Sequence, residues 1–477
     1  MKYAEVAVNY PPSQPRTFSY SIPPDISLNA GHAVLVPFGR RLVQGVVLSL
    51  SDYPSVEETK EISRTIGSEP VLSPYQLELS RWIAEYYLSS YFEAAALMLP
   101  PGFERRIITF IEPVPNASEV TLSSLTAPQK RLLAQLQRKG RLKLKELQKA
   151  DGGRSIEAVA EQLVRKRLAV KTQELDRIKV KPRLVPYLKL AVTADHVREL
   201  IPSLERKRAF RQVNVLGLLL QEQGPVPLSE LRKRYDITSN TVQALVRQGL
   251  VSVKQVRVQR DPLAHRIFAP SMALTLTPAQ GKAWSEIEAG MERLAHDEAL
   301  RTGTPQVFLL HGVTGSGKTE VYMRAVARAI SAGKRAIVLV PEIALTPQTI
   351  NRFAARFPDR VAVLHSRLSL GEQFDVWQRI KSGDYDVVIG SRGALFAPQP
   401  DLGVIVIDEE HEWTYKQQEQ PPRYHARDVA VKLAALTNSV LILGSATPDI
   451  TSYHLAQRGE FRLLQLPERI SGGEISP

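Results

Sequence analysis

The sequence has no cysteine among its 477 residues, which excludes disulfide bonds and metal sites with thiolate ligands. It has no run of about 18 apolar residues, the length that a membrane-spanning helix needs. Its first residues, MKYAEVAVNYPP, lack the apolar centre of a signal peptide and the Arg and Ser bias of a transit peptide. These absences predict a soluble intracellular protein with no membrane partner.

Positive charge is unevenly distributed along the chain, whose net charge is +13. Residues 121–260 contain 30 Lys and Arg against 12 Asp and Glu, so this stretch carries +18 and the other residues together carry −5. A local cationic excess is typical of proteins that bind a polyanion, because neutralising phosphates releases counterions. A well-solvated basic surface without a partner explains the same count equally well.

The length predicts about three domains. The first, residues 1–110, is expected to be mostly β, followed by a helical stretch at Ser73–Leu97 where apolar residues recur at helical spacing. The expected strands are short β-rich runs separated by Pro and Gly, at Tyr3–Val8, Thr17–Ile22, Ala33–Pro37 and Gln44–Leu50.

Residues 121–260 contain a diverged internal repeat. Each copy, 120–175 and 176–262, has the pattern of three short amphipathic helices followed by a β-like tail, which is the layout of a winged helix. The third helix of each copy is expected to start at a capping serine, Ser155 or Ser239. The equivalent helix of helix-turn-helix proteins enters the major groove. Such folds also mediate protein contacts alone, but the basic excess favours nucleic acid.

Residues 270–465 change character, because apolar runs now alternate with helical segments. Near-continuous Val, Ile and Leu runs predict a parallel sheet covered by helices on both faces. Most of these runs end in a polar motif, and ligands of open α/β sheets bind at this end of the strands. The expected strands are Val307–Leu310, Ala336–Val340, Ala362–Leu364, Val387–Ile389, Val404–Ile407 and Val440–Leu443.

A phosphate-binding P-loop is predicted at Gly312–Thr319, between an apolar strand and a helical segment at Glu320–Ala332. Its glycines allow backbone N–H groups to surround phosphates, and the helix N-terminus adds positive potential. Lys318 is expected to reach the β- and γ-phosphates, and Thr319 to bind Mg²⁺. The expected nucleotide-binding set is Gln280, Gly312, Thr314, Gly315, Ser316, Gly317, Lys318, Thr319 and Glu320.

An acidic box, Asp408-Glu409-Glu410-His411, ends another apolar strand about 90 residues later. Asp408 is expected to hold Mg²⁺, directly or through water, and Glu409 to orient and deprotonate the attacking water. His411 is a candidate for coupling this site to neighbouring motifs. On its own, that histidine is better explained by an ordinary hydrogen bond.

Further motifs occur along the chain in the order that is typical of a superfamily 2 helicase lobe. Gln280 lies upstream of the P-loop, where its amide can recognise adenine N6 and N7. Gly444–Pro448 follows an apolar strand, and Ser445 and Thr447 there are candidates for sensing the γ-phosphate and linking it to a DNA track. Two more strand ends carry backbone amides and hydroxyls that suit a sugar–phosphate chain, at Pro341–Thr346 and Ser391–Ala394, the latter including Arg392.

The segment Trp413–Asp428, just after the acidic box, interleaves aromatic residues with cations. Stacking on bases together with phosphate pairing is how proteins hold single strands without sequence preference. The alternative is a structured connector whose aromatic residues are buried. The candidate DNA contacts here are Trp413, Tyr415, Lys416, Arg423 and Tyr424.

The motifs resemble those of the bacterial replication-restart helicases of the PriA family, also called primosomal protein N′. The matching runs are GVTGSGKTEVY (312–322), VPEIALTPQT (340–349), GVIVIDEEH (403–411), YKQQE…RYHARD (415–428) and LGSATP (443–448). Pro15–Tyr20 and Val36–Gly39 resemble the family's domain that binds the 3′ end of a nascent leading strand. The fold class is therefore multidomain, with a β-rich DNA-binding domain, an α+β winged-helix region of one or two copies, and a RecA-like helicase lobe.

The resemblance implies ATP- and Mg²⁺-dependent 3′→5′ unwinding at stalled or repaired forks and promotion of primosome assembly in the bacterial cytoplasm, at the nucleoid. Implied partners are forked and single-stranded DNA, single-stranded DNA-binding protein, and other primosome and helicase-loader proteins. Ser19 occupies a position where the family often has an Asp that contacts the terminal nucleotide. The DNA contacts implied in the N-terminal domain are Arg16, Phe18, Ser19, Tyr20 and Gly39.

The sequence stops at Pro477, so 466–477 is expected to be a truncated tail, with the second RecA-like lobe and its arginine finger absent. The family's zinc-binding insertion belongs to that absent part, and this chain has no cysteine ligands for zinc. Because ATP is cleaved between two lobes, we expect this polypeptide to bind nucleotide weakly and to hydrolyse it poorly. Two alternatives to a helicase are a non-catalytic fork-DNA-binding and protein-assembly platform and another superfamily 2 translocase, such as a restriction-enzyme motor.

Overall fold

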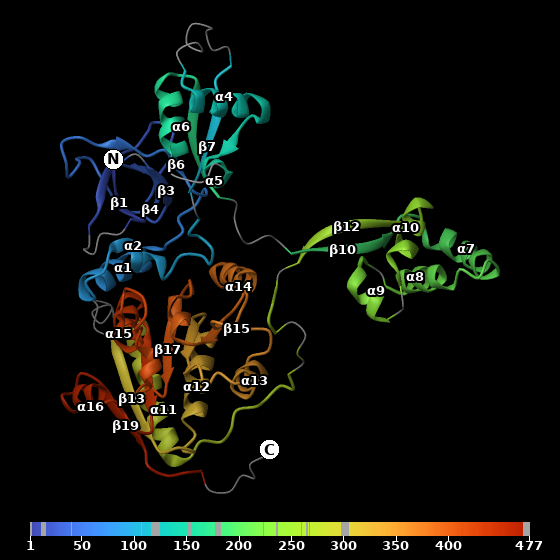
Figure 1. Cartoon of the computed structure of the whole chain (residues 1–477). Helices are drawn as coiled ribbons and strands as arrows, with labels where there is room; N and C mark the ends of the chain where they lie inside the picture. The colour runs from blue at the N-terminus through green and yellow to red at the C-terminus, as the bar shows by residue number, and fades with distance from the viewer. Residues whose placement is uncertain are drawn as a thin grey trace. The chain divides into compact units, whose positions relative to one another are not determined.

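The chain folds as two units, one made of Met1–Lys179 with His265–Pro477 and the other of Val180–Ala264 (Figure 1). The computed structural model describes residues 2–10, 16–39, 41–105, 107–115, 125–150, 155–176, 183–222, 224–234, 237–258, 260–263, 266, 268–296 and 305–470. Within these residues, no helix is both long enough and apolar enough to cross a bilayer.

The N-terminal segment forms a six-stranded sheet, since its β-branched residues favour strands and its Pro and Gly residues favour turns. Strands β1 and β4 pair antiparallel near the centre, and Val6, Val34 and Val47 are buried in its core. The four predicted strands are confirmed. The sheet order is β5-β2-β1-β4-β3-β6, with β1 (Tyr3–Val8), β2 (Phe18–Ser21), β3 (Ala33–Phe38), β4 (Arg41–Ser51), β5 (Lys60–Glu61) and β6 (Arg64–Thr65).

Two helices, α1 (Pro74–Tyr86) and α2 (Tyr91–Ala96), occupy the stretch for which one helical segment was expected. The chain breaks between them at Leu88, whose φ of 51° is incompatible with a continuing right-handed helix. Ser90 then starts α2 through a capping box, in which Ser90 N donates to Glu93 Oε2 at 3.0 Å and Glu93 N donates to Ser90 Oγ at 3.1 Å.

A small α+β segment follows in the first unit. Its helices bury Leu132, Leu136 and Leu163 against a three-stranded antiparallel sheet of order β8-β7-β9. The elements are β7 (Ile107–Pro113), α4 (Ala127–Lys139), β8 (Leu142–Lys143), α5 (Leu144–Ala150), α6 (Ser155–Arg165) and β9 (Ala169–Leu175).

The second unit has its own core, in which Leu188, Leu216 and Leu245 are fully buried. Its antiparallel sheet has the order β11-β10-β12, and β10 and β12 pair along their whole length, from Arg183 with Val258 to Leu190 with Val251. The elements are β10 (Arg183–Leu190), α7 (Ala194–Arg206), α8 (Phe210–Gln221), β11 (Val226–Pro227), α9 (Leu228–Arg234), α10 (Ser239–Arg247) and β12 (Val251–Val258).

Among the described residues, the two small segments share one order of elements and one order of strands, and the second has α7 in addition. Each begins with the strand that becomes the centre of its sheet, and the sequence did not predict β7 or β10. The expectation that Ser239 caps the third helix is wrong, because Thr238 Oγ1 accepts the hydrogen bond from Thr241 N at 3.4 Å and Ser239 is already helical. The capping role expected of Ser155 lies outside the described side chains.

The helicase-like segment contains a seven-stranded, all-parallel sheet of order β15-β16-β14-β17-β18-β13-β19. The six predicted strands are confirmed, and β19 is an unpredicted seventh at the edge. The strands are β13 (Gln306–Gly312), β14 (Arg335–Leu339), β15 (Val361–Leu364), β16 (Val387–Gly390), β17 (Leu402–Asp408), β18 (Val440–Ser445) and β19 (Arg462–Leu466). The helices are α11 (Pro278–His296), α12 (Lys318–Ser331), α13 (Pro347–Arg356), α14 (Leu370–Ser382), η2 (Arg392–Phe396), η3 (Trp413–Tyr415), α15 (Ala426–Thr437) and α16 (Ile450–Gln457).

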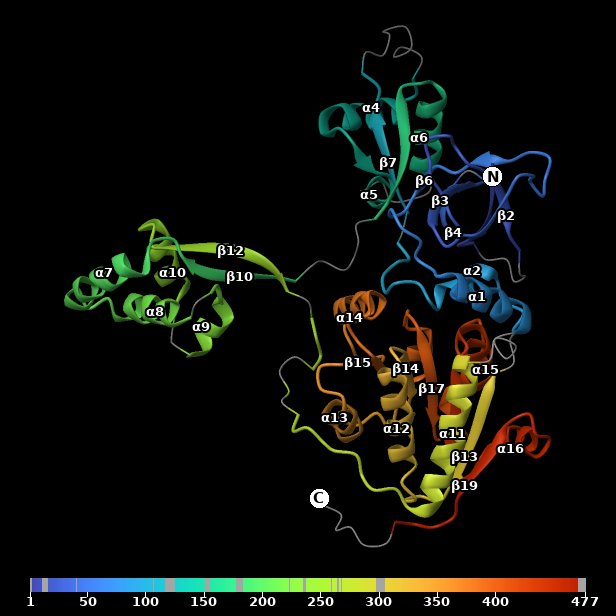
Figure 2. The ribbon, with the colours of Figure 1, turned by 180° about the vertical axis from the view of Figure 1, so that it is seen from behind.

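Alternate residues of the parallel strands face two different layers of helices. Leu309, Ile405 and Leu443 belong to one core with α14, α15, α1 and α2. On the other face, α11 approaches so closely that a Cβ at Gly290 would lie 2.6 Å from Phe308. Figures 1 and 2 show α1 and α2 next to α15 in both views. The N-terminal helices are therefore part of the layer that covers the parallel sheet.

Candidate nucleotide and DNA sites

The P-loop joins β13 to α12 by a turn that two glycines make possible. Gly315 and Gly317 have φ values of 83° and 76°, which residues with a side chain rarely adopt. Gly317 is the N-cap of α12, so the loop leads directly into the positive end of that helix. Lys318 is buried and its Nζ donates to Gly312 O at 2.9 Å, which folds the ammonium group back over the loop.

The acidic box meets the P-loop lysine at the carboxyl end of the parallel sheet, where β18 lies between β17 and β13. Asp408 is the last residue of β17, and the nearest oxygen of Glu409 lies 3.7 Å from Lys318 Nζ. Tyr322 donates its hydroxyl hydrogen to Asp408 Oδ1 at 3.0 Å, and Tyr415 donates to Asp408 O at 2.7 Å. A cation and two carboxylates thus lie close together at the carboxyl end of the sheet.

The environment of Asp408 opposes its charge. Burial, and then the adjacent charge of Glu409, raise the pKa of the Asp408 carboxyl to about 6, while the hydrogen bond from Tyr322 and the charge of Lys318 act in the opposite direction. A divalent cation would supply the compensating charge that this carboxylate lacks. Oxygen ligands of this kind suit Mg²⁺. The role of Thr319 and Asp408 in holding the ion stays a prediction.

Three predicted coupling residues lie together beside the acidic box. His411 Nδ1 is 2.7 Å from Ser445 Oγ and 3.7 Å from Glu409 Oε2. Thr447 N donates to Ser445 Oγ at 3.0 Å. The contact between β17 and β18 therefore places the motif around Ser445 next to the residue expected to orient water. The coupling role itself stays a prediction.

Two members of the expected nucleotide set make contacts within the protein. Glu320 is buried and forms ion pairs with Arg356 at 3.4 Å and Arg324 at 3.6 Å, so its carboxylate does not face the loop's glycines. Gln280 Oε1 accepts from Thr277 N at 2.9 Å, and Gln280 Nε2 donates to Ser316 O at 2.8 Å. These bonds hold the Gln280 amide against the P-loop.

A cavity of about 830 Å³ opens at the carboxyl end of the parallel sheet. Its walls come from Leu97–Pro101, the two strand-end motifs near Pro341 and Arg392, and the segment after the acidic box. Of the predicted DNA contacts, it is lined by Arg392, Trp413, Tyr415, Lys416 and Tyr424, whereas Arg423 is exposed outside it.

The aromatic residues of this cavity are not equivalent. Tyr415 and Tyr424 are 1% and 3% exposed, and Tyr424 packs edge-on against Phe396 with ring centroids 5.0 Å apart. A buried ring offers no face to a base, so these two support the connector interpretation. Trp413 is 69% exposed and is the ring available for stacking.

The cations of the same segment also have protein partners. The Arg392 guanidinium donates to Thr414 O at 2.9 Å, to Lys416 O at 2.8 Å and to Gln417 Oε1 at 2.7 Å. Lys416 Nζ donates to Arg423 O at 2.6 Å and lies 5.3 Å from the ring centre of Tyr87. Arg392 therefore shapes the segment in this conformation, rather than pointing freely into the cavity.

A second cavity, of about 500 Å³, lies on the N-terminal sheet and gathers every residue expected to contact a 3′ end. Arg16, Phe18, Ser19, Tyr20 and Gly39 all line it. Thr17 Oγ1 donates to Glu5 Oε2 at 2.7 Å, and Ser19 Oγ donates to Glu5 Oε1. Sequence reasoning missed Glu5, because its proximity follows from the pairing of Glu5 with Ser19 between β1 and β2.

Family models match two parts of the chain. Residues 5–100 match a 3′ DNA-binding domain (3′BD), and residues 277–455 match a DEAD/DEAH box helicase. Over 99% of its length the chain is 35% identical to the replication restart protein PriA of Bacillus subtilis, and over all of it 34% identical to PriA of Synechocystis. The chain belongs to the PriA family.

The match to these relatives covers 56% of each of them, so the chain spans about half the length of the curated relatives it matches. The solved structure of RecG bound to a three-way DNA junction is 26% identical over 42% of this chain and 25% of that one, with a TM-score of 0.31. The family assignment rests on the sequence matches alone.

Each of the two sites described above lies within one of the two matched regions. The small cavity with Phe18 and Ser19 lies within the 3′ DNA-binding match, and the P-loop and acidic box lie within the helicase match. The helicase match implies the use of ATP and Mg²⁺. Among the described residues, no cluster of three or more His, Cys, Asp or Glu is arranged to hold a metal ion.

A buried polar network behind the acidic box was also missed from the sequence. Glu410 accepts from Asp449 N at 2.7 Å and from Ser452 Oγ at 2.9 Å. Arg427 donates to Asp449 Oδ1 at 2.8 Å, and its neighbour Asp428 accepts from the hydroxyl of Tyr87 at 3.1 Å. The acidic box and the run RYHARD supply some of the charged residues of this network and were visible in the sequence. Their hydrogen-bond partners Asp449, Ser452 and Tyr87 are distant in sequence and could not be matched to them.

Proposed function

We propose that the chain binds ATP with Mg²⁺ and DNA as the N-terminal part of an ATP-driven 3′→5′ helicase that acts at stalled or repaired forks. The observation that carries this proposal is the distance of 3.7 Å between Lys318 and Glu409, the residue that follows Asp408 at the end of β17. In this arrangement Lys318 binds the β- and γ-phosphates, and Thr319 and Asp408 hold Mg²⁺. Glu409 orients the attacking water.

For a polypeptide of residues 1–477 alone, we propose nucleotide binding with little turnover. RecA-like motors cleave ATP between two lobes, and an arginine from the second lobe contributes roughly 10³–10⁵ in rate. The described residues contain one seven-stranded parallel sheet. Forked DNA is therefore expected to raise the hydrolysis rate of this polypeptide only slightly.

The small cavity is proposed to hold the terminal nucleotide at the 3′ end of a DNA strand. Phe18 and Tyr20 provide apolar walls, and Arg16 lies beside them. Although Ser19 replaces a carboxylate that is frequent in the family, its hydroxyl bonds to Glu5, so a carboxylate is still present one strand away. Phe18→Ala is expected to weaken binding to a strand with a free 3′ end without weakening binding to a circular single strand.

The two small α+β segments are proposed to be winged helices, of which the second contacts duplex DNA. On α10, Asn240, Gln243 and Arg247 are exposed on the side opposite the buried Val242 and Leu245. Amides and guanidinium groups at this spacing suit base edges and phosphates in the major groove. In the first segment α6 instead has Glu157 exposed and Glu161 partly exposed, which would repel phosphates.

Promotion of primosome assembly, with single-stranded DNA-binding protein and loader proteins as partners, is proposed from family membership. The match of residues 5–100 to a 3′ DNA-binding domain favours a fork protein over a restriction-enzyme motor. The close approach of Lys318 to Glu409 favours an ATP-using protein over a non-catalytic platform.

The test is Mg²⁺-dependent binding of a fluorescent ATP analogue labelled on the ribose. Lys318→Ala should weaken binding about tenfold or more, because it removes a charge-assisted hydrogen bond to phosphate. Lys334→Ala is the matched control. Lys334 is exposed just before β14, at the amino-terminal end of the strands, whereas the P-loop lies at their carboxyl-terminal end. Equal affinities of wild type and Lys318→Ala would refute the nucleotide site. Rapid fork-stimulated hydrolysis would refute only the requirement for a second lobe.

A further inference from the structure

A third cavity, also of about 500 Å³, lies where the first α+β segment meets the N-terminal sheet. Both parts belong to the first unit. Leu42 N donates to Gln173 Oε1 at 2.8 Å, so a hydrogen bond joins β4 to β9 at this place. Leu42 forms one wall of the cavity, and the other wall consists of Glu161, Val164, Arg165, Lys171 and Gln173 from α6 and β9.

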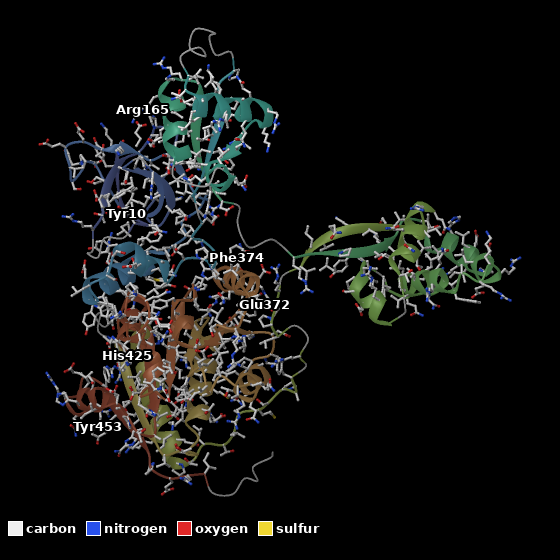
Figure 3. All side chains as sticks on the ribbon, in the orientation of Figure 1. Tyr10, Arg165, Glu372, Phe374, His425 and Tyr453 are labelled. Atoms are coloured by element: carbon white, nitrogen blue, oxygen red, sulfur yellow. The ribbon has the colours of Figure 1, made fainter. Side chains whose placement is uncertain are left out.

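The walls of this cavity carry a cation that is available to a ligand. Lys171 Nζ lies 3.7 Å from Glu161 Oε1, so the carboxylate in the wall already has a partner. Arg165, the last residue of α6, is exposed, and no carboxylate of the described residues forms an ion pair with it. Figure 3 labels Arg165 on α6, beside the N-terminal sheet. Its guanidinium is therefore free to bind an anion at the cavity.

Two further cations lie on the face of the N-terminal sheet to which Leu42 belongs. Side chains alternate along a strand, so Leu42 and Gln44 of β4 share one face. Leu35 of β3 pairs with Gln44 on one side and with Arg64 of β6 on the other, which places Arg64 on that face too. Arg105 N donates to Gln44 Oε1 at 2.8 Å, so Arg105 lies over the same row of residues.

The charges of Arg64 and Arg105 act on each other. Burial, and then the positive charge of Arg64, lower the pKa of Arg105. Within the part of the chain that the structure describes, neither guanidinium forms an ion pair. Repulsion between two such cations lowers the stability of the fold, and a bound anion would offset it. We refer to Arg64, Arg105, Arg165 and the cavity beside them as the junction.

The junction and the small cavity proposed for a 3′ end lie on one hairpin. Leu42, in the wall of the junction, pairs with Pro37 of β3, and Pro37 lines the small cavity together with Gly39. The Cα atoms of paired residues in an antiparallel ladder are about 5 Å apart. A strand whose last nucleotide fills the small cavity therefore has its preceding phosphates within reach of the junction.

We propose that the junction binds the phosphodiester backbone of the strand whose 3′-terminal nucleotide occupies the small cavity. The inference rests on the proposed 3′-end site and adds the contact that holds the nucleotides preceding that end. Arg64, Arg105 and Arg165 pair with phosphates, which positions a strand without reading its sequence. The first α+β segment then contributes a backbone contact through Arg165 at the end of α6, and α6 does not enter a groove, which the exposed Glu157 opposes.

The experiment compares a trinucleotide and a hexanucleotide that share one free 3′ end, by fluorescence anisotropy with a 5′ label on the 477-residue chain. The trinucleotide extends little beyond the small cavity, whereas the hexanucleotide adds the preceding phosphates. Arg165→Ala should weaken hexanucleotide binding about fivefold and leave trinucleotide binding unchanged. It should also reduce the slope of log affinity against log salt by about 0.7, the value of one phosphate contact on a single strand.

Arg105→Ala should have the same effect as Arg165→Ala, and Arg105→Lys, which keeps the charge, should restore the salt slope. The same hexanucleotide capped by a 3′ phosphate measures binding at the other DNA sites of the chain. Its affinity should not change in any of these variants.

Arg138→Ala is the matched control, because Arg138 is an exposed cation of α4 in the same α+β segment, and it should change neither affinity. Phe18→Ala should weaken both oligonucleotides, which identifies a loss of the small cavity. Unchanged hexanucleotide affinity in Arg165→Ala and Arg105→Ala, or equal weakening of both lengths, would overturn the junction while leaving the proposed 3′-end site intact.

Two more outcomes separate the remaining alternatives. If Phe18→Ala changed neither affinity, the proposed 3′-end site would fail, and this inference with it. If hexaglutamate bound wild type as tightly as the hexanucleotide and Arg165→Ala weakened both, the junction would be a surface for an acidic protein, and its assignment to DNA would be wrong.

Discussion

At the scale of single residues, Asp408 gives the folding stability a pH dependence. Its pKa is raised to about 6 in the folded state, so the folded protein binds this proton more tightly than the unfolded chain does. The resulting stabilisation is fully present below the unfolded pKa of 3.8 and is lost as the pH rises through about 6. Ionised Asp408 at neutral pH therefore lowers the stability of the metal-free protein.

We predict that Asp408→Asn raises the melting temperature at pH 7.5 relative to wild type, in buffer with a chelator and without nucleotide. The difference should shrink toward pH 5, with an upper limit of about 3 kcal/mol for a shift of about two pKa units. Melting curves of both proteins between pH 5 and 8 measure it. A difference that grows toward pH 5 would show that burial does not dominate at Asp408.

Arg427 is the cation at the centre of the missed network. Its side chain is 11% exposed and pairs with Asp449 at 2.8 Å and Asp428 at 3.1 Å. Removing it leaves two carboxylates without their partner, so Arg427→Ala should lower the free energy of unfolding by about 2–4 kcal/mol. Arg458→Ala, which removes an exposed pair with Glu460, should cost about 0.5 kcal/mol or less. Urea denaturation of the two variants makes the comparison, and similar losses would contradict a structural role for Arg427.

At the scale of elements, the segment after the acidic box separates a structural part from an exposed part. Trp413→Ala should weaken binding of single-stranded DNA by about 1–3 kcal/mol, the value of one stacked base, without changing the melting temperature. Tyr424→Ala should instead lower the melting temperature, because that ring is buried against Phe396. Fluorescence anisotropy with a labelled single strand and thermal melting distinguish the two. A loss of DNA binding only in Tyr424→Ala would reverse the assignment.

The sequence was informative about elements wherever a local pattern sufficed. Near-continuous apolar runs identified β13 to β18, and the glycine pattern identified the P-loop turn. Patterns failed where a partner distant in sequence decides the outcome. β19 is an edge strand defined by its pairing with β13. The break between α1 and α2 depends on a left-handed conformation at Leu88, and a leucine, unlike a glycine, gives no sign of such a conformation in the sequence.

The same limit applies to side chains in the candidate sites. Asp408 and Glu409 lie at the end of β17, and Lys318 begins the helix that follows β13 in the same parallel sheet, so their proximity could be foreseen. The burial of Tyr415 and Tyr424 could not, because alternating aromatic residues and cations occur both in exposed loops and in packed connectors. Glu5 and Glu410 have partners that only the folded chain brings close.

At the scale of the whole molecule, the second unit has a core of its own and an exposed basic residue on α10. Arg247→Ala should weaken duplex DNA binding to a similar degree for different sequences and reduce the slope of log affinity against log salt by about 1, if Arg247 contacts a phosphate. It should leave ATP binding unchanged. Arg138→Ala, in the last turn of α4, is a control of the same type in the other α+β segment. Equal effects of the two variants would contradict the assignment of duplex binding to α10.

The pairing of Arg183 with Val258 places the first and last described residues of the second unit's sheet side by side. A module whose ends are adjacent can be gained or lost in evolution by a single insertion or deletion, because the flanking chain must bridge nearly the same gap either way. The geometry of these paired ends therefore allows the second unit to change in length without changing the distance that the flanking chain must bridge.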